Sequence, residues 1–207
     1  HLGRLGTDSI ALCFGSSSFF GGPSFDTEFV AEAASHSHDT PVYTAAMAMT
    51  AALKAAGVRR PLVMMPPWFT PPTFEATEKY LTAVGIERIR IAQFDLGPQW
   101  AAIPRYNAFD EGARWAVDPH DVHRQTLTAF KDAEDTAVDG ILVPGSGFRT
   151  QDAVVPLEQE LQIPVITANQ SVLWYGLNQA TPKPRTDTGH HPHGSLFTLP
   201  LPTNKPQ

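Results

Sequence analysis

Short apolar runs alternate with segments of helical pattern along most of the 207-residue chain. Most runs are followed by a turn of small residues or prolines, and the next segment repeats its apolar residues at the spacing of a helix face. Strands are expected at 9–14, 41–44, 61–65, 87–94, 140–144 and 164–168, and helices at 25–35, 45–56, 72–84, 118–136, 151–161 and 169–179. Strands that alternate with helices of this length form a mostly parallel sheet covered by helices. The sequence therefore predicts an α/β fold.

Two parts of the chain resemble each other. The stretch DSIALCFGS at 8–16 aligns with DGILVPGSG at 139–147, and PVYTA at 41–45 aligns with PVITA at 164–168. Each block is a strand that ends in a turn of small residues, followed by a helix and a second strand. The pattern favours two flavodoxin-like α/β halves related by a pseudo-twofold axis, with a ligand between the strand ends. The alternative is that any two strand–helix units look alike.

This repeat divides the chain into two halves and a tail. The first half takes residues 1–57 and 169–180, and the second half takes residues 58–168. Residues 181–207 are rich in proline and histidine without a period, so we expect an extended, exposed tail.

The composition excludes several classes of partner. Hydrophobic residues are 42% of the chain, the net charge is -6, and no basic block occurs, so nucleic acid is not an expected partner. No apolar run approaches the roughly 20 residues that a membrane helix needs. The first residues lack the apolar core of a signal peptide, and we expect a cytoplasmic homo-oligomer without metal or cofactor. The single cysteine excludes an intramolecular disulfide and a cysteine-rich metal site.

Turns of small residues, at 15–18 and 145–147, follow the first strand of each repeat. Main-chain N–H groups and hydroxyls just ahead of a helix bind carboxylates and phosphates. Because the two turns occupy equivalent places, we predict an anion site between them. The alternative is an ordinary pair of strand–helix loops. The residues expected to line the site are Phe14, Gly15, Ser16, Ser17, Trp68, Gly145, Ser146, Gly147 and Phe148.

Three further side chains have open interpretations. Cys13 could act as a nucleophile or proton carrier, although free cysteine is more often a small core residue. Trp68 follows a strand and could wall a pocket or pack beneath its proline loop. Ser146 is a candidate nucleophile, but neither turn contains the G-x-S-x-G motif and no partner histidine can be assigned.

The histidines do not indicate a metal site. His36 and His38 lie at a predicted helix end, and His120 and His123 lie near a helix start. The i, i+3 spacing of the latter pair would allow a shared metal, but no carboxylate motif accompanies it, so exposed helix positions are the simpler interpretation. The tail histidines would bind a metal only adventitiously.

A family resemblance is carried by DSIALCFGSSSFFGG (8–22), AALKAAGVRRPLVMMPPWF (51–69), DGILVPGSGFRTQDAV (139–154) and LQIPVITANQSVLWYGL (161–177). These stretches are similar to the Asp/Glu/hydantoin racemase superfamily, in the branch of maleate cis-trans isomerases and arylmalonate decarboxylases. The resemblance implies a substrate between two α/β halves, with its carboxylate held by amides and hydroxyls of the two turns. It also implies a further strand and helix ahead of residue 8 that this sequence does not contain.

The resemblance implies a thiol at the turns, and the sequence departs from that pattern. Racemases and isomerases of the superfamily use one cysteine on either side of the substrate, and decarboxylases keep only the second as a proton donor. Those positions fall on Phe14 and Gly145, with Cys13 one residue early. A tyrosine common on the middle loop falls on Trp68. The single cysteine excludes the two-thiol reaction.

Three classes of function follow. The first is an enzyme with non-standard catalytic residues that isomerises, racemises or decarboxylates a small carboxylic acid through an enediolate-like species. Turn amides and serine hydroxyls would stabilise that species, and the proton would pass through water, Cys13 or another group. The second is an inactive relative that binds a small carboxylate or serves as an assembly subunit. The third is a hydrolase or lyase that uses Ser146.

Overall fold

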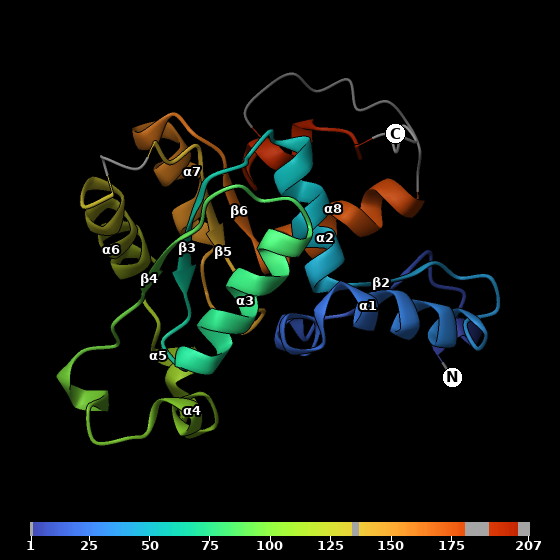
Figure 1. Cartoon of the computed structure of the whole chain (residues 1–207), viewed down its shortest axis with the longest axis horizontal. Coiled ribbons are helices and arrows are strands. Elements are labelled where there is room, and N and C mark those ends of the chain that lie inside the picture. The colour runs from blue at the N-terminus through green and yellow to red at the C-terminus, as the bar shows by residue number, and fades with distance from the viewer. Residues whose placement is uncertain (1, 134–136, 181–190, 203–207) are drawn as a thin grey trace.

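The computed structural model describes residues 2–133, 137–180 and 191–202 (Figure 1). Its strands are β1 (Ile10–Leu12), β2 (Val42–Thr44), β3 (Pro61–Met65), β4 (Arg90–Gln93), β5 (Gly140–Val143) and β6 (Val165–Thr167). Its α-helices are α1 (Gly15–Ala34), α2 (Ala45–Ala55), α3 (Pro71–Ala83), α4 (Arg105–Ala108), α5 (Arg114–Ala116), α6 (Pro119–Lys131), α7 (Gln151–Leu161) and α8 (Ala168–Ala180). Short 3₁₀ turns are η1 (Leu2–Arg4), η2 (Pro98–Trp100) and η5 (Ser195–Thr198), and η3 (Phe109–Ala113) is π-helical. Residues 181–190 and 203–207 of the predicted tail lie outside the described residues.

The strands form two separate parallel sheets. The smaller sheet pairs β1 with β2, and Ile10 lies opposite Val42. The larger sheet has the order β4-β3-β5-β6, and Leu62 of β3 lies opposite both Arg90 and Ile141. Each of these pairings is parallel. The predicted α/β fold is therefore confirmed.

The larger sheet is covered on both faces, because successive side chains of a strand point to opposite sides. On one face, Leu62 and Met64 of β3 pack with α6 and α7. On the other face, Val63 and Met65 pack with α2, α3 and α8 (Figure 1). All four side chains are at most 1% exposed. Burial on both faces explains why β3 and β5, the two central strands of this sheet, are unbroken apolar runs in the sequence.

A common apolar core joins helix α1, which follows the first strand of the smaller sheet, to the larger sheet. Phe19 of α1, Met49 of α2 and Leu142 of β5 belong to one cluster of buried side chains. The smaller sheet takes its strands from residues 10–44 and the larger sheet from residues 61–167. This membership supports the proposed division of the chain into two halves, which stays a prediction.

Helix α1 begins earlier than the sequence pattern indicates. The pattern predicts a loop of small residues followed by a later helix, whereas α1 begins at Gly15 and continues through a kink at Gly22. Gly22 has a φ of 74°, which glycine adopts without strain, and Pro23 follows it, so the missing N–H of the proline falls at the kink. Phe19 is 3% exposed. Its burial outweighs the weak helix propensity of the serines before it.

Residues 191–202, which we call the strap, are packed against the fold. Leu196 and Phe197 are 0% and 2% exposed and belong to the core that α2 and α8 share. The Trp174 indole N–H donates to the main-chain oxygen of Leu199 at 2.9 Å. The expectation of an exposed tail is therefore wrong for the strap. Its apolar side chains bury enough surface to hold an irregular segment in place.

Candidate functional site

The two predicted turns are in direct contact. The Ser146 hydroxyl donates a hydrogen bond to the main-chain oxygen of Cys13, across 133 positions of sequence. Cys13 follows β1 of the smaller sheet, and Ser146 follows β5 of the larger sheet. The carboxyl ends of parallel strands are where α/β proteins bind ligands. We call residues 13–17 and 145–148 together the turn junction.

The first turn of the junction is the start of helix α1. The N–H groups of Gly15 and Ser16 have no partner within the helix, because a helix leaves its first donors unpaired. The Ser17 N–H donates to the Phe14 oxygen at 3.1 Å. Phe14 is 69% exposed, and its φ of -102° suits any side chain. The turn therefore presents main-chain donors to an anion, while the Phe14 ring stands in solvent.

The second turn of the junction contains two glycines whose main chain packs directly against neighbouring side chains. The Phe148 N–H donates to the Gly145 oxygen at 3.2 Å and closes the turn. Gly145 has a φ of +107°, and a Cβ on it would lie 2.5 Å from Cγ of Pro66. A Cβ on Gly147 would overlap the ring of Phe109. Both glycines are therefore needed for this close packing.

An aromatic cluster supports the second turn from behind. Trp68 is 9% exposed and Phe148 is 1% exposed, and their ring centres are 5.8 Å apart. Phe109 meets Trp68 edge-on at 5.1 Å, and Phe94 meets Phe148 at 5.3 Å. Trp68 thus packs beneath its loop, one of the two interpretations left open by the sequence. A role for Trp68 and Phe148 in lining a substrate stays a prediction.

Two side chains hydrogen-bond to the middle loop, residues 66–69, and the sequence analysis did not predict either of them. The Gln93 amide donates to the Phe69 oxygen at 2.7 Å, and Arg105 donates to the Pro67 oxygen at 3.1 Å. Gln93 lies at the carboxyl end of β4. Gln93 could have been identified from the sequence, because it is a polar side chain with two donors at the carboxyl end of a predicted strand.

Cys13 lies at the border of the junction. It lines a surface pocket of about 380 Å³ between β1 and α8, together with Ser9 and Tyr43. Desolvation raises the pKa of the Cys13 thiol above its ordinary value of 9.0, although the residue as a whole is exposed. The thiol is therefore protonated at neutral pH, which suits a proton donor better than a nucleophile.

A buried carboxylate fixes the start of α1 against α3. Asp26 is 3% exposed, and its oxygens accept hydrogen bonds from the Ser18 hydroxyl and the Tyr80 hydroxyl, each at 2.5 Å. Ser18 follows the residues of the first turn directly. No pattern in the sequence connects these three residues, because they lie on two different helices.

Alkaline titration tests this network. Burial, and then the hydrogen bond to Asp26, raise the pKa of Tyr80 above its ordinary value of 10.0. The stability that Tyr80 contributes is complete below that value and is lost as the pH rises toward the folded-state pKa. Above pH 10, we expect the unfolding free energy of the wild type to fall more steeply than that of Tyr80→Phe, by up to about 1.4 kcal/mol per pH unit. Urea denaturation at a series of pH values measures this difference, and equal slopes would contradict it.

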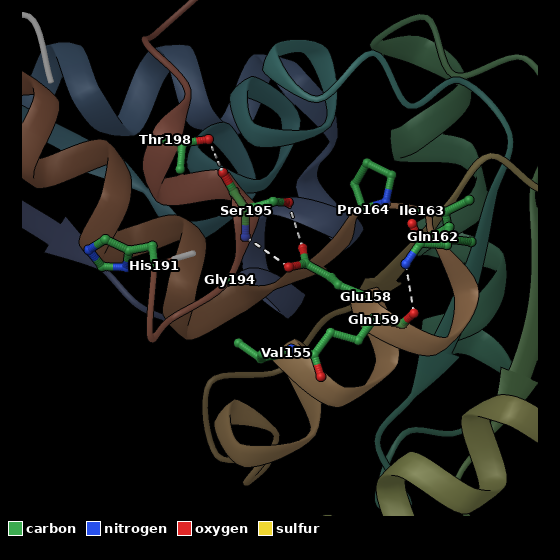
Figure 2. A pocket seen from close by; sticks show the side chains of 10 residues that line it. All are labelled: Val155, Glu158, Gln159, Gln162, Ile163, Pro164, His191, Gly194, Ser195 and Thr198. Carbon is green, nitrogen blue, oxygen red and sulfur yellow. Dashed lines mark hydrogen bonds between the residues drawn. The ribbon is translucent and has the colours of Figure 1, made fainter. Parts of the chain in front are cut away.

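A second pocket, of about 520 Å³, lies away from the junction, between α7 and the strap (Figure 2). Glu158 accepts hydrogen bonds from the N–H and the hydroxyl of Ser195 at 2.8 and 2.7 Å, as Figure 2 shows. The Val165 N–H donates to the same carboxylate at 3.2 Å. These bonds attach the strap to α7, so we assign the Glu158 carboxylate a structural role.

Surface histidines pair with acids in the described part of the chain. His36 lies 3.4 Å from Glu32, and His123 lies 3.3 Å from Glu160. Among residues 2–133, 137–180 and 191–202, no cluster of three or more His, Cys, Asp or Glu side chains is placed to hold a metal ion. Within the same residues, every helix is too short or too polar to cross a membrane.

The sequence model of the arylmalonate decarboxylase family matches residues 1–191. The chain belongs to the arylmalonate decarboxylase family. This confirms the branch of the racemase superfamily that the sequence motifs indicate. A comparison with curated protein sequences finds no match.

Solved structures of this family and of maleate isomerases share the fold. A glycine-to-cysteine variant of arylmalonate decarboxylase in a sulfate-associated form is 22% identical, with a TM-score of 0.76, over 95% of this chain and 76% of that chain. A maleate isomerase variant from Pseudomonas putida S16 with maleate is 19% identical, with a TM-score of 0.72, over 95% and 72%. A maleate cis-trans isomerase variant from Nocardia farcinica with a covalently bound succinylcysteine intermediate is 18% identical, with a TM-score of 0.65, over 92% and 71%.

Proposed function

We propose that this chain is an enzyme that binds a small carboxylic acid at the turn junction. It would act on the carbon next to the carboxylate, by decarboxylation or isomerisation. The observation that carries the proposal is the hydrogen bond from Ser146 to Cys13, which joins two donor-bearing turns from opposite parts of the chain. Family membership supports an acid as substrate, and the sulfate-associated and maleate-bound relatives support an anionic ligand.

The junction is suited to hold a carboxylate and the charge that develops from it. The free N–H groups of Gly15 and Ser16 and the hydroxyl of Ser17 would bind the carboxylate oxygens. The close packing of Gly145 on Pro66 and of Gly147 on Phe109 would fix the second turn opposite these donors. Donors fixed in advance stabilise an enediolate more than they stabilise the starting acid.

The proton step can be written for decarboxylation. The bond between the central carbon and one carboxylate breaks, carbon dioxide leaves, and the electron pair stays as an enediolate. The central carbon then takes a proton from the Cys13 thiol or from water. If Cys13 is the donor, its thiolate regains a proton from solvent. The raised pKa of Cys13 supports this role, because the proton is present at neutral pH.

A second candidate is an inactive family member that binds a small carboxylate. The family's thiol positions are proposed to fall on Phe14 and Gly145. The backbone at Gly145 supports this candidate, since its φ of +107° and the contact with Pro66 disfavour any side chain there. In that case the junction would bind acids without changing them.

Removal of the Ser146 hydroxyl tests the proposed site. Ser146→Ala breaks the bond between the turns, and we expect kcat/KM on an arylmalonate or on maleate to fall by about tenfold or more. Release of carbon dioxide and loss of the maleate double-bond absorbance measure the two reactions. Cys13→Ala tests the proton donor, because a thiol that donates the proton makes this variant about a hundredfold slower or more.

Ser35→Ala is the matched control. Ser35 caps the far end of α1, and its hydroxyl donates to the main-chain oxygen of Glu32 at 2.6 Å, so loss of this hydroxyl should leave kcat/KM unchanged. Unaltered kinetics in Ser146→Ala would refute the site. Binding of the acids without turnover in the wild type would favour the inactive family member instead.

A further inference from the structure

Asp26 closes a kink in helix α1. The helix is broken at Gly22, and Pro23 has no N–H to donate across the break. The Ser18 hydroxyl, before the kink, donates to the Asp26 carboxylate, after the kink, at 2.5 Å. Glycine and proline are the residues at which helices bend, and this hydrogen bond spans both of them. The half of α1 that begins at Gly15 is therefore held to the half that follows.

Asp26 also attaches α1 to helix α3. The Tyr80 hydroxyl of α3 donates to the second Asp26 oxygen at 2.5 Å, and the Tyr80 ring meets Phe19 of α1 edge-on at 5.5 Å. The two helices lie side by side in the fold (Figure 1). Ser18, Asp26 and Tyr80 are 0%, 3% and 3% exposed. We call these three residues the Asp26 network.

Helix α3 connects the Asp26 network to the second turn of the junction. The helix begins at Pro71, two residues after the middle loop ends. That loop packs on Gly145 through Pro66. The start of α3 is thus tied to the second turn, while Tyr80 later in the same helix is tied to the first. Because a helix keeps a fixed length, the network sets how far apart the two turns lie.

The network contains a carboxyl group where an apolar side chain would be the ordinary choice. A buried polar group costs free energy unless its hydrogen bonds are made, and apolar burial stabilises without that condition. Apolar contact is also non-directional, whereas a hydrogen bond restricts both distance and angle. Asp26 therefore suits a place where the position of one helix against another has to be narrowly defined.

We propose that Asp26 is a positioning residue of the turn junction. It acts through Ser18, three residues after Gly15 and two after Ser16, and so fixes the two N–H groups assigned to the ligand carboxylate. The inference rests on the proposed function, because it needs an acid bound by those N–H groups. A displacement of about 1 Å at such groups costs up to about a hundredfold in rate, so the position of the first turn matters.

Removal of either hydroxyl tests this role. Isothermal titration calorimetry measures the Kd of succinate and of phenylacetate, two acids that the proposed reactions leave unchanged. We expect Ser18→Ala and Tyr80→Phe each to raise the Kd of the acid that the wild type binds more tightly by about fivefold. Tyr80→Phe serves alone if Ser18→Ala does not fold.

The double variant shows whether the two hydroxyls act through one carboxylate. Loss of either bond already separates the first half of α1 from α3, so a second loss has little left to remove. Ser18→Ala with Tyr80→Phe should therefore raise the Kd by about fivefold again, and not by the roughly 25-fold that independent effects would give.

Thr77→Val is the matched control on the same helix. Thr77 is 0% exposed, and its hydroxyl donates to the Thr73 oxygen within α3 at 2.7 Å. Its replacement should lower the urea midpoint as the network variants do, because a buried hydrogen bond is lost. The Kd of the acid should change by less than about twofold, since a loss of stability alone does not move the first turn.

The outcomes separate this inference from the proposed function. Binding of neither acid by the wild type refutes the proposed site and, with it, the role of Asp26. If the wild type binds and both single variants keep its Kd within about twofold, Asp26 has no positioning role and the site stands. Equal weakening by Thr77→Val, or fold-changes that multiply in the double variant, also overturns the role of Asp26.

Discussion

Cysteine in place of Gly145 will destabilise the fold by about 3 kcal/mol. Gly145 has a φ of +107°, a conformation that residues with a Cβ rarely adopt, and the added Cβ would lie 2.5 Å from Cγ of Pro66. Backbone strain and overpacking each contribute on the order of 1–3 kcal/mol. The turn must therefore move before a thiol can stand at this position.

Urea denaturation of Gly145→Cys and Phe14→Cys measures how differently the two turns tolerate a cysteine side chain. Phe14 is 69% exposed with a φ of -102°, so its replacement should change the unfolding free energy by less than about 0.5 kcal/mol. Equal stability of both variants would show that the second turn tolerates a side chain. With the expected result, the two-thiol arrangement cannot be rebuilt here by substitution of these two residues alone.

Phe197→Ala will lower the unfolding free energy by about 4 kcal/mol. Phe197 is 2% exposed, belongs to the core shared by α2 and α8, and stacks on His191 with ring centres 4.7 Å apart. Truncation of a buried phenylalanine loses its burial and leaves a cavity. The strap would then keep few of the contacts that hold it.

Phe20→Ala is the matched control, because Phe20 is 60% exposed and should change stability by less than about 0.5 kcal/mol. Chemical denaturation of the two variants side by side gives the comparison. If both unfold at the urea concentration of the wild type, the strap is not part of the core.

Much of the fold could be predicted from periodicity. The apolar runs at 61–65 and 140–144 correspond to β3 and β5, and Asp118 caps α6 through a hydrogen bond from the N–H of His120 at 2.9 Å. These features depend on residues that are neighbours in the chain. The predictions of where α1 begins and of an exposed strap were wrong, because burial against distant residues overrides local propensity.

The candidate site could be predicted only in part. The small-residue turns were visible, but Gln93 and Asp26 carried no motif. Their importance comes from what faces them: loop carbonyls around Gln93 and hydroxyls around Asp26. A single sequence shows the type of a side chain and not its neighbours across the fold.

The sequence by itself determined the alternation of strands and helices, the mostly parallel α/β fold and the exclusion of a two-thiol reaction within this sequence. Those properties follow from residue type and local spacing, which do not depend on how the parts of the chain meet. Only the tertiary structure decided that Ser146 bonds to Cys13 and that Gly145 has no room for a side chain beside Pro66. Both contacts join segments far apart in sequence, and their geometry exists only after the ends of β1 and β5 have been brought together in the fold.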